Sequence, residues 1–437
     1  MRTAETAARL TAFERRGAGT DAERRAAAWL CSELEGGRRE AALEPFWCRP
    51  NWALAHAWHV GLGVAGSLVS VSSPTIGASL VLVAIVSVLA DAVWGASPGR
   101  RLTPERASQN VVSQPLATRP EASPAARPDA STDDGPDASG AAAQRVRLIV
   151  TANYDAGRAG LVYRNRLRRA TALMRRVAGD GRLSPGWLGW LVITHVWLLA
   201  VALIRDLSSG TPGAAVGVLQ LIPTVVLVLY LALLLELASS DFGPAAADNA
   251  AGAAVALALV RALDAAPPRR LSVELVLQGA GDGEMTGLAR HLRAERRQLS
   301  PPKAIVLGIG PFGGPRLCWW TGDGNLLPLR YHHRLRDLAA ELAASDQGLT
   351  AWPHRGRGAS PALPGRSAGI PAINLGCLDD QDLPARSHAP EDTADALDPQ
   401  ALDGLLQFAL MLVEAIDSDL VARTPAPPTP APAAAHL

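Results

Sequence analysis

Four short polar segments carry the residue types that hydrolytic metal sites use. They are Asn153-Tyr154-Asp155, Asp248-Asn249, Asp282-Gly283-Glu284 and Ser387-His388. Carboxylate and imidazole groups are ligands of zinc, and a carboxylate beside a metal is able to act as a general base. Each segment alone also has a structural interpretation, because Asp-Asn before an alanine-rich run is a helix cap and Glu284 before a helix suits its dipole.

The elements that must position these segments alternate between short apolar strands and longer helices. The expected strands are Glu40–Trp47, Gln109–Ser113, Val146–Ala152, Ser272–Gln278, Ala304–Ile309 and Ile370–Leu375. The expected helices are Ala22–Glu35, Ala250–Ala265, Thr286–Arg297, Leu327–Ser345 and Pro399–Asp417. This alternation predicts an α/β fold, a three-layer sandwich with a mainly parallel (mixed) sheet. Ligands of such sheets bind outside the carboxyl ends of the strands.

Two long apolar regions interrupt this pattern. No charged residue occurs from Asn51 to Ala90, and a second apolar region runs from Gly186 to Leu235 with one charged turn at Arg205-Asp206. Each region is long enough for two helices of about 20 residues, the length that crosses a bilayer. We therefore predict four transmembrane helices in two inserted hairpins, 51–95 and 186–238.

Arginine placement predicts the orientation of these hairpins. Arginines concentrate around residues 38–49, 100–106 and 164–182, whereas the connecting turns hold only Arg205. Because basic residues stay on the cytoplasmic side, we expect an integral protein of a bacterial-type inner membrane with the large domain and both termini in the cytoplasm. The arginine-rich stretch from 164 to 176 indicates either an amphipathic helix on an anionic leaflet or a solvated helix.

The composition limits the remaining possibilities. The chain has 437 residues, 42 basic and 41 acidic side chains, a net charge of +1 and a mean hydropathy of +0.11. A near-neutral chain is a poor partner for nucleic acid. Four cysteines without CxxC spacing indicate reduced thiols. Residues 115–144 and 424–437 are predicted to be disordered, which leaves one discontinuous domain made of 1–50, 96–185 and 239–423.

Taken together, the motifs resemble metallopeptidase family 28, the co-catalytic zinc aminopeptidases and carboxypeptidases. The chain reads "ANYDAG", "AAADNAAG", "GDGEMTGL", "AIVLGIG" and "SHAPEDTADALD" in the order in which that family carries its site motifs, and "AGIPAINL" is similar to its G-I-P-A strand. The resemblance implies a zinc-exopeptidase-like fold. It also implies a bridging metal ligand at Asp248, a terminal ligand at His388, a general base at Glu284 and an orienting carboxylate at Asp155.

Three of the five metal-ligand positions depart from the family pattern. Asn153 and Met285 replace a histidine and a glutamate, and Gly308 stands where a strand aspartate is expected. Amide and thioether groups are poor zinc ligands, so two co-catalytic zincs are not expected and the site is left with one zinc or none. Substitute ligands are available nearby, although these residues also suit loops and caps: Asp282, Asp379, Asp380 and Asp382.

Three functions remain open. The first is a membrane-anchored, catalytically degenerate peptidase-like protein (a pseudoenzyme) that binds or scaffolds a peptide or protein partner beside the lipid bilayer. The second is an active exopeptidase that hydrolyses N-terminal peptide bonds with one metal. The third is transport or lipid binding by the bundle, with His195 as its candidate residue, because a histidine at mid-membrane is either functional or a structural hydrogen-bonding group.

Overall fold

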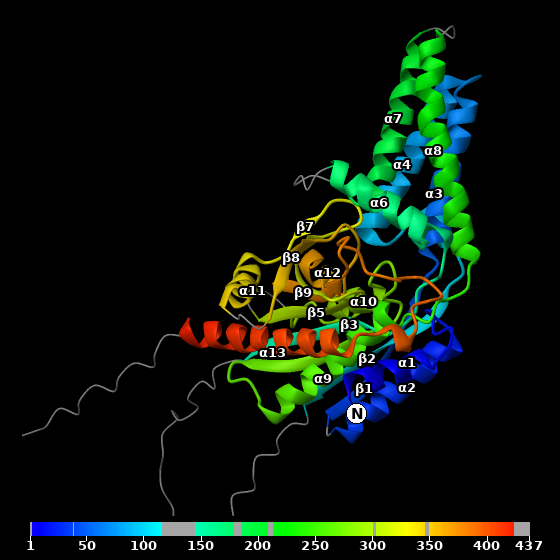
Figure 1. Ribbon diagram of the computed structural model, residues 1–437. Helices are drawn as coiled ribbons and strands as arrows, with labels where there is room; N and C mark the ends of the chain where they lie inside the picture. Colours follow the sequence, from blue (N-terminus) through cyan, green and yellow to red (C-terminus); the bar gives the residue numbers. More distant parts are fainter. Residues whose placement is uncertain are drawn as a thin grey trace, which may run out of the picture.

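The computed structural model describes residues 2–37, 39–115, 145–178, 185–208, 213–299, 303–345 and 349–423. Residues 116–144 of the predicted disordered insert and the predicted tail 424–437 lie outside these ranges. Figure 1 shows two parts, an α/β domain and a bundle of helices that projects from it.

The described residues place nine strands in one mixed sheet. Their order is β1-β2-β4-β3-β5-β9-β6-β7, and β8 pairs with β6. The strands are β1 (Arg39–Cys48), β2 (Arg106–Pro115), β3 (Val146–Asn153), β4 (Leu271–Gln278), β5 (Ala304–Phe312), β6 (Arg316–Asp323), β7 (Leu329–Arg330), β8 (Ala351–Arg355) and β9 (Ala372–Leu378). The central strands β4, β3, β5 and β9 are parallel, and β1 and β2 are antiparallel to their neighbours. This sheet confirms the predicted fold class.

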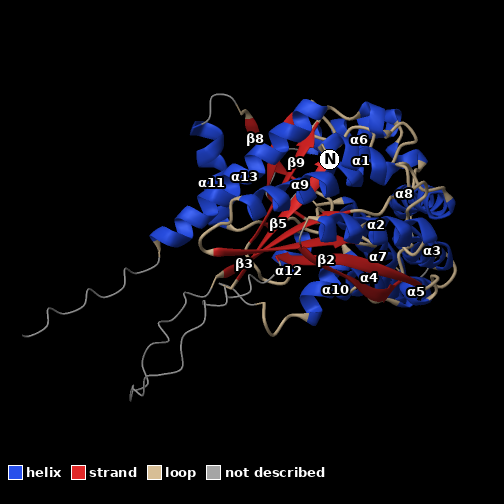
Figure 2. Ribbon diagram, turned by 90° about the horizontal axis from the view of Figure 1, so that it is seen from below, coloured by secondary structure: helices blue, strands red, loops and turns tan. Residues whose placement is uncertain are grey.

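Helices cover both faces of the sheet, as Figure 2 shows. One face packs on α1 (Thr3–Thr11), α2 (Asp21–Gly36), α9 (Ala251–Ala265), α11 (His333–Ser345) and α13 (Pro399–Ala422). The other face packs on α10 (Thr286–Ala294) and α12 (Leu363–Ser367). Small side chains let α9 approach the sheet closely: a Cβ at Gly252 would lie 2.8 Å from the carbonyl oxygen of Ile309.

The projecting bundle is built from α3 (Trp52–Val69), α4 (Pro74–Trp94), α7 (Trp187–Leu207) and α8 (Ala214–Ser239). Short elements join it to the domain: α5 (Pro98–Arg101), a 3₁₀ turn η1 (Leu161–Tyr163) and α6 (Asn165–Ala178). In Figure 1, α6 lies across the base of the bundle. The α3–α4 turn is set by Pro74 at the start of α4, where a missing N–H costs nothing.

Four of the described helices are long and apolar enough to span a membrane. They are Pro74–Trp94, Trp187–Leu207, Ala214–Ser239 and Ala246–Ala265. The last of these is the α9 segment, which is 78% buried and packs on the sheet, so it is a core helix. The predicted first span corresponds to α3, which is not among the four because the imidazoles of His56 and His59 lower its hydropathy.

His195 occupies a packed position in the bundle. It is fully buried, and its Nδ1 lies 2.8 Å from the Leu191 carbonyl oxygen one turn earlier. A Cβ at Gly63 on α3 would lie 2.4 Å from His195 Nε2, so the ring fills the space that this glycine leaves. These contacts favour the structural interpretation of His195 over a transport role.

Candidate metal centre

Three predicted residues of the polar segments meet at the carboxyl ends of the parallel strands. Asp248 lies in the π-turn η2 (Ala246–Ala250) before α9, Asp282 follows β4, and His388 lies in the loop before α13. One ligand atom from each lies within 4.8 Å of the other two. His388 Nε2 is 3.4 Å from Asp248 Oδ2 and also 3.4 Å from Asp282 Oδ1.

These separations suit one tetrahedral metal ion. Two donors that each lie about 2.1 Å from a tetrahedral zinc are about 3.4 Å apart. The donor set of two carboxylates and one imidazole is also one that zinc accepts, with a fourth position left open. The Asp248–Asp282–His388 cluster therefore fits a single zinc ion.

Two residues of the "SHAPEDTADALD" motif, Ser387 and Asp392, fix the position of Asp248. The carboxylate of Asp392 accepts hydrogen bonds from the backbone N–H groups of Ala247 (2.8 Å) and Asp248 (3.1 Å). The hydroxyl of Ser387 donates to Asp248 Oδ1 at 2.8 Å. The motif that supplies His388 thus also fixes the turn that presents Asp248.

His388 is oriented by two contacts. Its Nδ1 lies 3.1 Å from the carbonyl oxygen of Arg158, and the ring of Tyr163 stacks on it with the centroids 4.2 Å apart. An Nδ1–H that donates to a carbonyl leaves the Nε2 lone pair free for a metal. Burial disfavours the charged imidazole, but the carboxylates of Asp248 and Asp282 outweigh burial and raise the pKa of His388 above its ordinary value.

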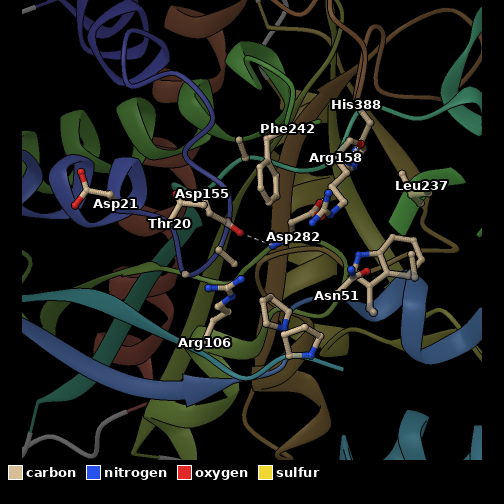
Figure 3. Close-up of a pocket in the computed structure, with 17 residues that line it drawn as sticks. Thr20, Asp21, Asn51, Arg106, Asp155, Arg158, Leu237, Phe242, Asp282 and His388 are labelled. Carbon is tan, nitrogen blue, oxygen red and sulfur yellow. Dashed lines mark hydrogen bonds and ion pairs between the residues drawn. The ribbon is translucent and has the colours of Figure 1, made fainter. Parts of the chain in front are cut away.

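Asp282 is the member of the cluster whose role the sequence leaves open. Its backbone N–H donates to Asp155 Oδ2 at 3.1 Å, and the Trp52 indole donates to its carboxylate. Burial and the neighbouring Asp248 carboxylate raise the pKa of Asp282, although His388 opposes this shift. Figure 3 shows Asp155, Asp282 and His388 around a pocket of about 400 Å³. Asp155, expected to orient a ligand histidine, instead holds the Asp282 loop.

Glu284, the expected general base, points to a different partner. Both of its carboxylate oxygens accept hydrogen bonds from Arg100, one of them at 2.6 Å. Arg100 is 7% exposed and also pairs with Asp91 at the end of α4, with 2.8 Å between Nε and Oδ1. Burial raises the pKa of Glu284, and Arg100 opposes this shift.

The three replaced positions contribute no metal ligand in this arrangement. The Asn153 amide lies 3.5 Å from Asn249 Oδ1, and Met285 is buried at the start of α10 with a φ of 53°. A Cβ at Gly308 would lie 2.3 Å from Asn374 Oδ1 and 2.5 Å from the backbone nitrogen of Ala362. An aspartate at position 308 therefore does not fit without a shift of its neighbours.

Of the four substitute ligands, three have other partners or positions. Asp379 pairs with Arg168, Asp382 pairs with Arg316, and Asp380 is exposed. Only Asp282 joins the cluster. The sequence analysis did not identify Trp52 and Arg100 as neighbours of the site. Both lie at the ends of the first apolar region, and this position could have indicated that they lie where the bundle meets the domain.

A known protein family matches the part of the chain that carries the candidate site. Residues 237–413 match Peptidase family M28. This M28 match contains Asp248, Asp282, Glu284 and His388, and it confirms the resemblance that the motifs indicated. Over residues 237–413, the chain is thus similar to the M28 peptidases. Among curated proteins, no sequence matches this chain.

Solved structures show the same fold at low identity. A zinc aminopeptidase from Bacillus subtilis has a TM-score of 0.50 and 12% identity, over 96% of this chain and 94% of that one. The LapA aminopeptidase of Legionella pneumophila has a TM-score of 0.48 and 12% identity, over 95% and 71%. A glutaminyl cyclase of Fimbriiglobus ruber has a TM-score of 0.47 and 14% identity, over 95% and 94%. The similarity to the Bacillus subtilis structure, at a TM-score of 0.50, supports the zinc-exopeptidase-like fold that the motifs predict.

Proposed function

We propose that this M28-type chain is a membrane-anchored hydrolase of peptide-type amides that uses one zinc ion. The observation that carries the proposal is the Asp248–Asp282–His388 cluster, in which His388 Nε2 lies 3.4 Å from each carboxylate. Asp282 supplies the third ligand that the loss of a glutamate at position 285 had removed. Three protein ligands with an open fourth position are the arrangement of catalytic rather than structural zinc sites.

In the proposed hydrolysis, the zinc ion and the residues that orient its ligands have separate roles. A bound zinc ion supplies Lewis acidity toward a carbonyl oxygen and lowers the pKa of water. Arg158 and Tyr163 orient His388, and Asp392 fixes Asp248, so the donors are preorganised. In the hydrolysis, the amide C–N bond breaks, water supplies the hydroxyl of the new carboxylate, and the departing amine takes up a proton.

Glu284 is the candidate for the base that removes the proton from water. It lines the same cleft as Asp248 and His388, and burial raises its pKa above the ordinary value of a glutamate, although Arg100 opposes this shift. The ion pair with Arg100 has to open before Glu284 accepts a proton. We therefore assign Glu284 the base role in an open state of this ion pair.

Membrane anchoring is supported by the surface of the bundle. Large apolar side chains with 40% exposure or more are concentrated on α4, α7 and α8. Such a surface is unfavourable in water and suits hydrocarbon. We propose that the bundle spans the membrane and that the metal centre lies just outside its base.

A second function, binding or scaffolding without hydrolysis, is favoured by one observation. Arg100 occupies both oxygens of Glu284 in the described structure. If this pair does not open, the chain has a metal site but no base. A degenerate, partner-binding role of this kind follows from the replaced ligands at Asn153 and Met285.

Zinc content and amidase activity of the purified full-length protein test the proposal. We expect about one zinc per chain, a zinc-dependent rise in Tm, and hydrolysis of alanine amides that a chelator abolishes. Asp282→Asn and His388→Ala should lose all three. Asp380→Asn removes the same charge at an exposed position and should retain them.

The outcomes separate the two functions. Zinc binding without turnover of any amide would support the binding role. A chain that takes up no zinc, with an unchanged Tm, would refute the single-zinc site itself.

A further inference from the structure

The metal cluster opens into a long cleft that continues onto the helical bundle. The cleft has a volume of about 2100 Å³, and Asp248, Asp282 and His388 line one end of it. Its other walls include Trp94 of α4, Trp190 of α7 and Leu229 of α8. These three side chains are 70%, 46% and 59% exposed, respectively. The cleft thus joins the metal cluster to apolar side chains of the bundle, which we call its apolar arm.

The apolar arm runs along the surface that we assign to the bilayer. The base of this arm is lined by Leu167 and Leu173 of α6, the helix that lies across the foot of the bundle in Figure 1. Both leucines are exposed, at 41% and 63%. An arm with this lining, set against membrane-spanning helices, faces lipid chains rather than water.

The lining of the arm also limits the kind of substrate that it accepts. Apart from Thr194, the side chains that α7 and α8 contribute to the cleft are apolar or aromatic, while α4 and α6 contribute Asp91 and Arg168 beside their apolar residues. A peptide segment placed there would leave backbone N–H and C=O groups without hydrogen-bond partners, which is strongly unfavourable away from water. An alkyl chain has no such groups and gains free energy with each methylene that it buries.

We propose that the cleft takes amphiphilic substrates, in which a peptide-type amide head reaches the metal cluster and an unbranched alkyl or acyl chain lies in the arm. This inference rests on the proposed amidase function and adds the substrate class. The substrate enters laterally from the bilayer with its chain between α4, α7 and α8. A smaller pocket of about 400 Å³ is also lined by Asp282 and His388.

A series of alanine n-alkylamides, from methyl to dodecyl, tests the inference with the full-length, zinc-loaded protein. Each methylene is expected to lower KM by up to about fourfold until the arm is filled, while kcat changes little. Leu229→Asn should flatten this dependence on chain length. Leu221→Asn is the matched control, because Leu221 lies on the same helix with 60% exposure and does not line the cleft.

The results that would overturn the inference are specific. KM that is independent of chain length, or an equal slope in the Leu229→Asn and Leu221→Asn variants, would refute it. A stronger preference for a hydrophobic peptide amide of the same length would assign the arm to peptides instead.

A measurement of ligand binding without hydrolysis tests the substrate class independently of the proposed amidase function. Calorimetry of alanine dodecylamide with the Asp282→Asn variant measures the arm without turnover. Retained binding together with absent hydrolysis in the unmodified protein would refute only the amidase function. Hydrolysis of the methylamide without any gain from longer chains would refute only the amphiphile inference.

Discussion

Arg100 joins the domain to the bundle through two carboxylates, Asp91 and Glu284. Its side chain is 8% exposed and that of Asp91 is 1% exposed, so removal of the guanidinium leaves a buried carboxylate without its partner. We expect Arg100→Ala to lower the free energy of unfolding by about 3–5 kcal/mol. The exposed neighbour Arg101 provides the control, and Arg101→Ala should stay within about 0.5 kcal/mol. Denaturant unfolding in detergent measures both, and equal effects would contradict the buried role of Arg100.

Glu23 gives the stability of the domain a pH dependence. It is fully buried, and burial raises its pKa from 4.5 to about 7 despite hydrogen bonds from Ser108, Gly19 and Ala280. In the unfolded chain Glu23 ionises near pH 4.5, so the folded state binds its proton more tightly between pH 4.5 and 7. This contribution to stability is present below pH 4.5 and is lost, by about 3 kcal/mol, as the pH rises through 7.

The Glu23→Gln variant should lose this dependence, because glutamine does not titrate. Although the amide offers fewer acceptors to the surrounding donors, that cost is constant with pH. Tm measured from pH 4.5 to pH 8 should therefore fall less steeply in the variant than in the unmodified chain. Parallel pH profiles would show that Glu23 ionises normally in the folded state.

At the scale of elements, the contact between α3 and α7 depends on one glycine. A Cβ at Gly63 would meet His195 Nε2 at 2.4 Å, whereas a Cβ at Gly61 on the same helix meets nothing within 4 Å. Both Gly→Ala changes gain about 1 kcal/mol of helix propensity. We expect Gly61→Ala to raise Tm and Gly63→Ala to lower it, as overpacking of the bundle outweighs the gain. Equal shifts would mean that His195 moves aside at little cost.

The sequence predicted the strands that apolar runs form, but it did not predict the strands whose formation depends on pairing within the folded sheet. All six predicted strands are present. β3, β4, β5 and β9 are apolar runs that the sheet buries, whereas β1 lies at the sheet edge and is mostly exposed or half-buried. β6, β7 and β8 were not predicted. β6 pairs with β9 and β8 from later parts of the chain, and β7 is a two-residue strand that pairs with β6. The helix predicted over Leu327–Ser345 begins at His333, because Leu329 and Arg330 pair with Asp323 and Gly322 instead.

In the candidate site, too, the contacts that local motifs encode were predicted, and those that depend on distant parts of the chain were not. The motifs gave Asp248 and His388 as neighbours across about 140 residues, and the structure places them 3.4 Å apart. The role of Asp282 depends on how the loop after β4 turns, which Asp155 and Trp52 decide from distant parts of the chain. The capture of Glu284 depends on Arg100, which reaches the site only because α4 ends beside it. Neither arrangement is encoded in a local pattern.

At the scale of the whole molecule, both hairpins are expected to have their turns on the far side of the membrane from the α/β domain. Ser72 in the α3–α4 turn and Ser345 at the end of α11 are both exposed and report on the two sides. In a Cys31→Ser background, Ser72→Cys should react with an impermeant thiol reagent in intact cells. Ser345→Cys should react only after permeabilisation, and the reverse result would place the domain outside.

The remaining cysteines do not interfere with this assay. Cys48, Cys318 and Cys377 are buried, so they react slowly with a bulky reagent in the folded protein. The unmodified Cys31→Ser background serves as the blank on both sides.

β3 lies between the two hairpins in the sequence, and this position determines the order in which the sheet and the bundle are synthesised. β3 leaves the ribosome before α7 and α8, yet both of its sheet partners, β4 and β5, begin only at Leu271 and Ala304. At about 5–20 residues per second, the central strand waits for several seconds or more with both edges unpaired. If the bundle spans the membrane as we propose, the second hairpin is inserted during this time. On that proposal, completion of the sheet, and with it the meeting of Asp248, Asp282 and His388, follows membrane insertion.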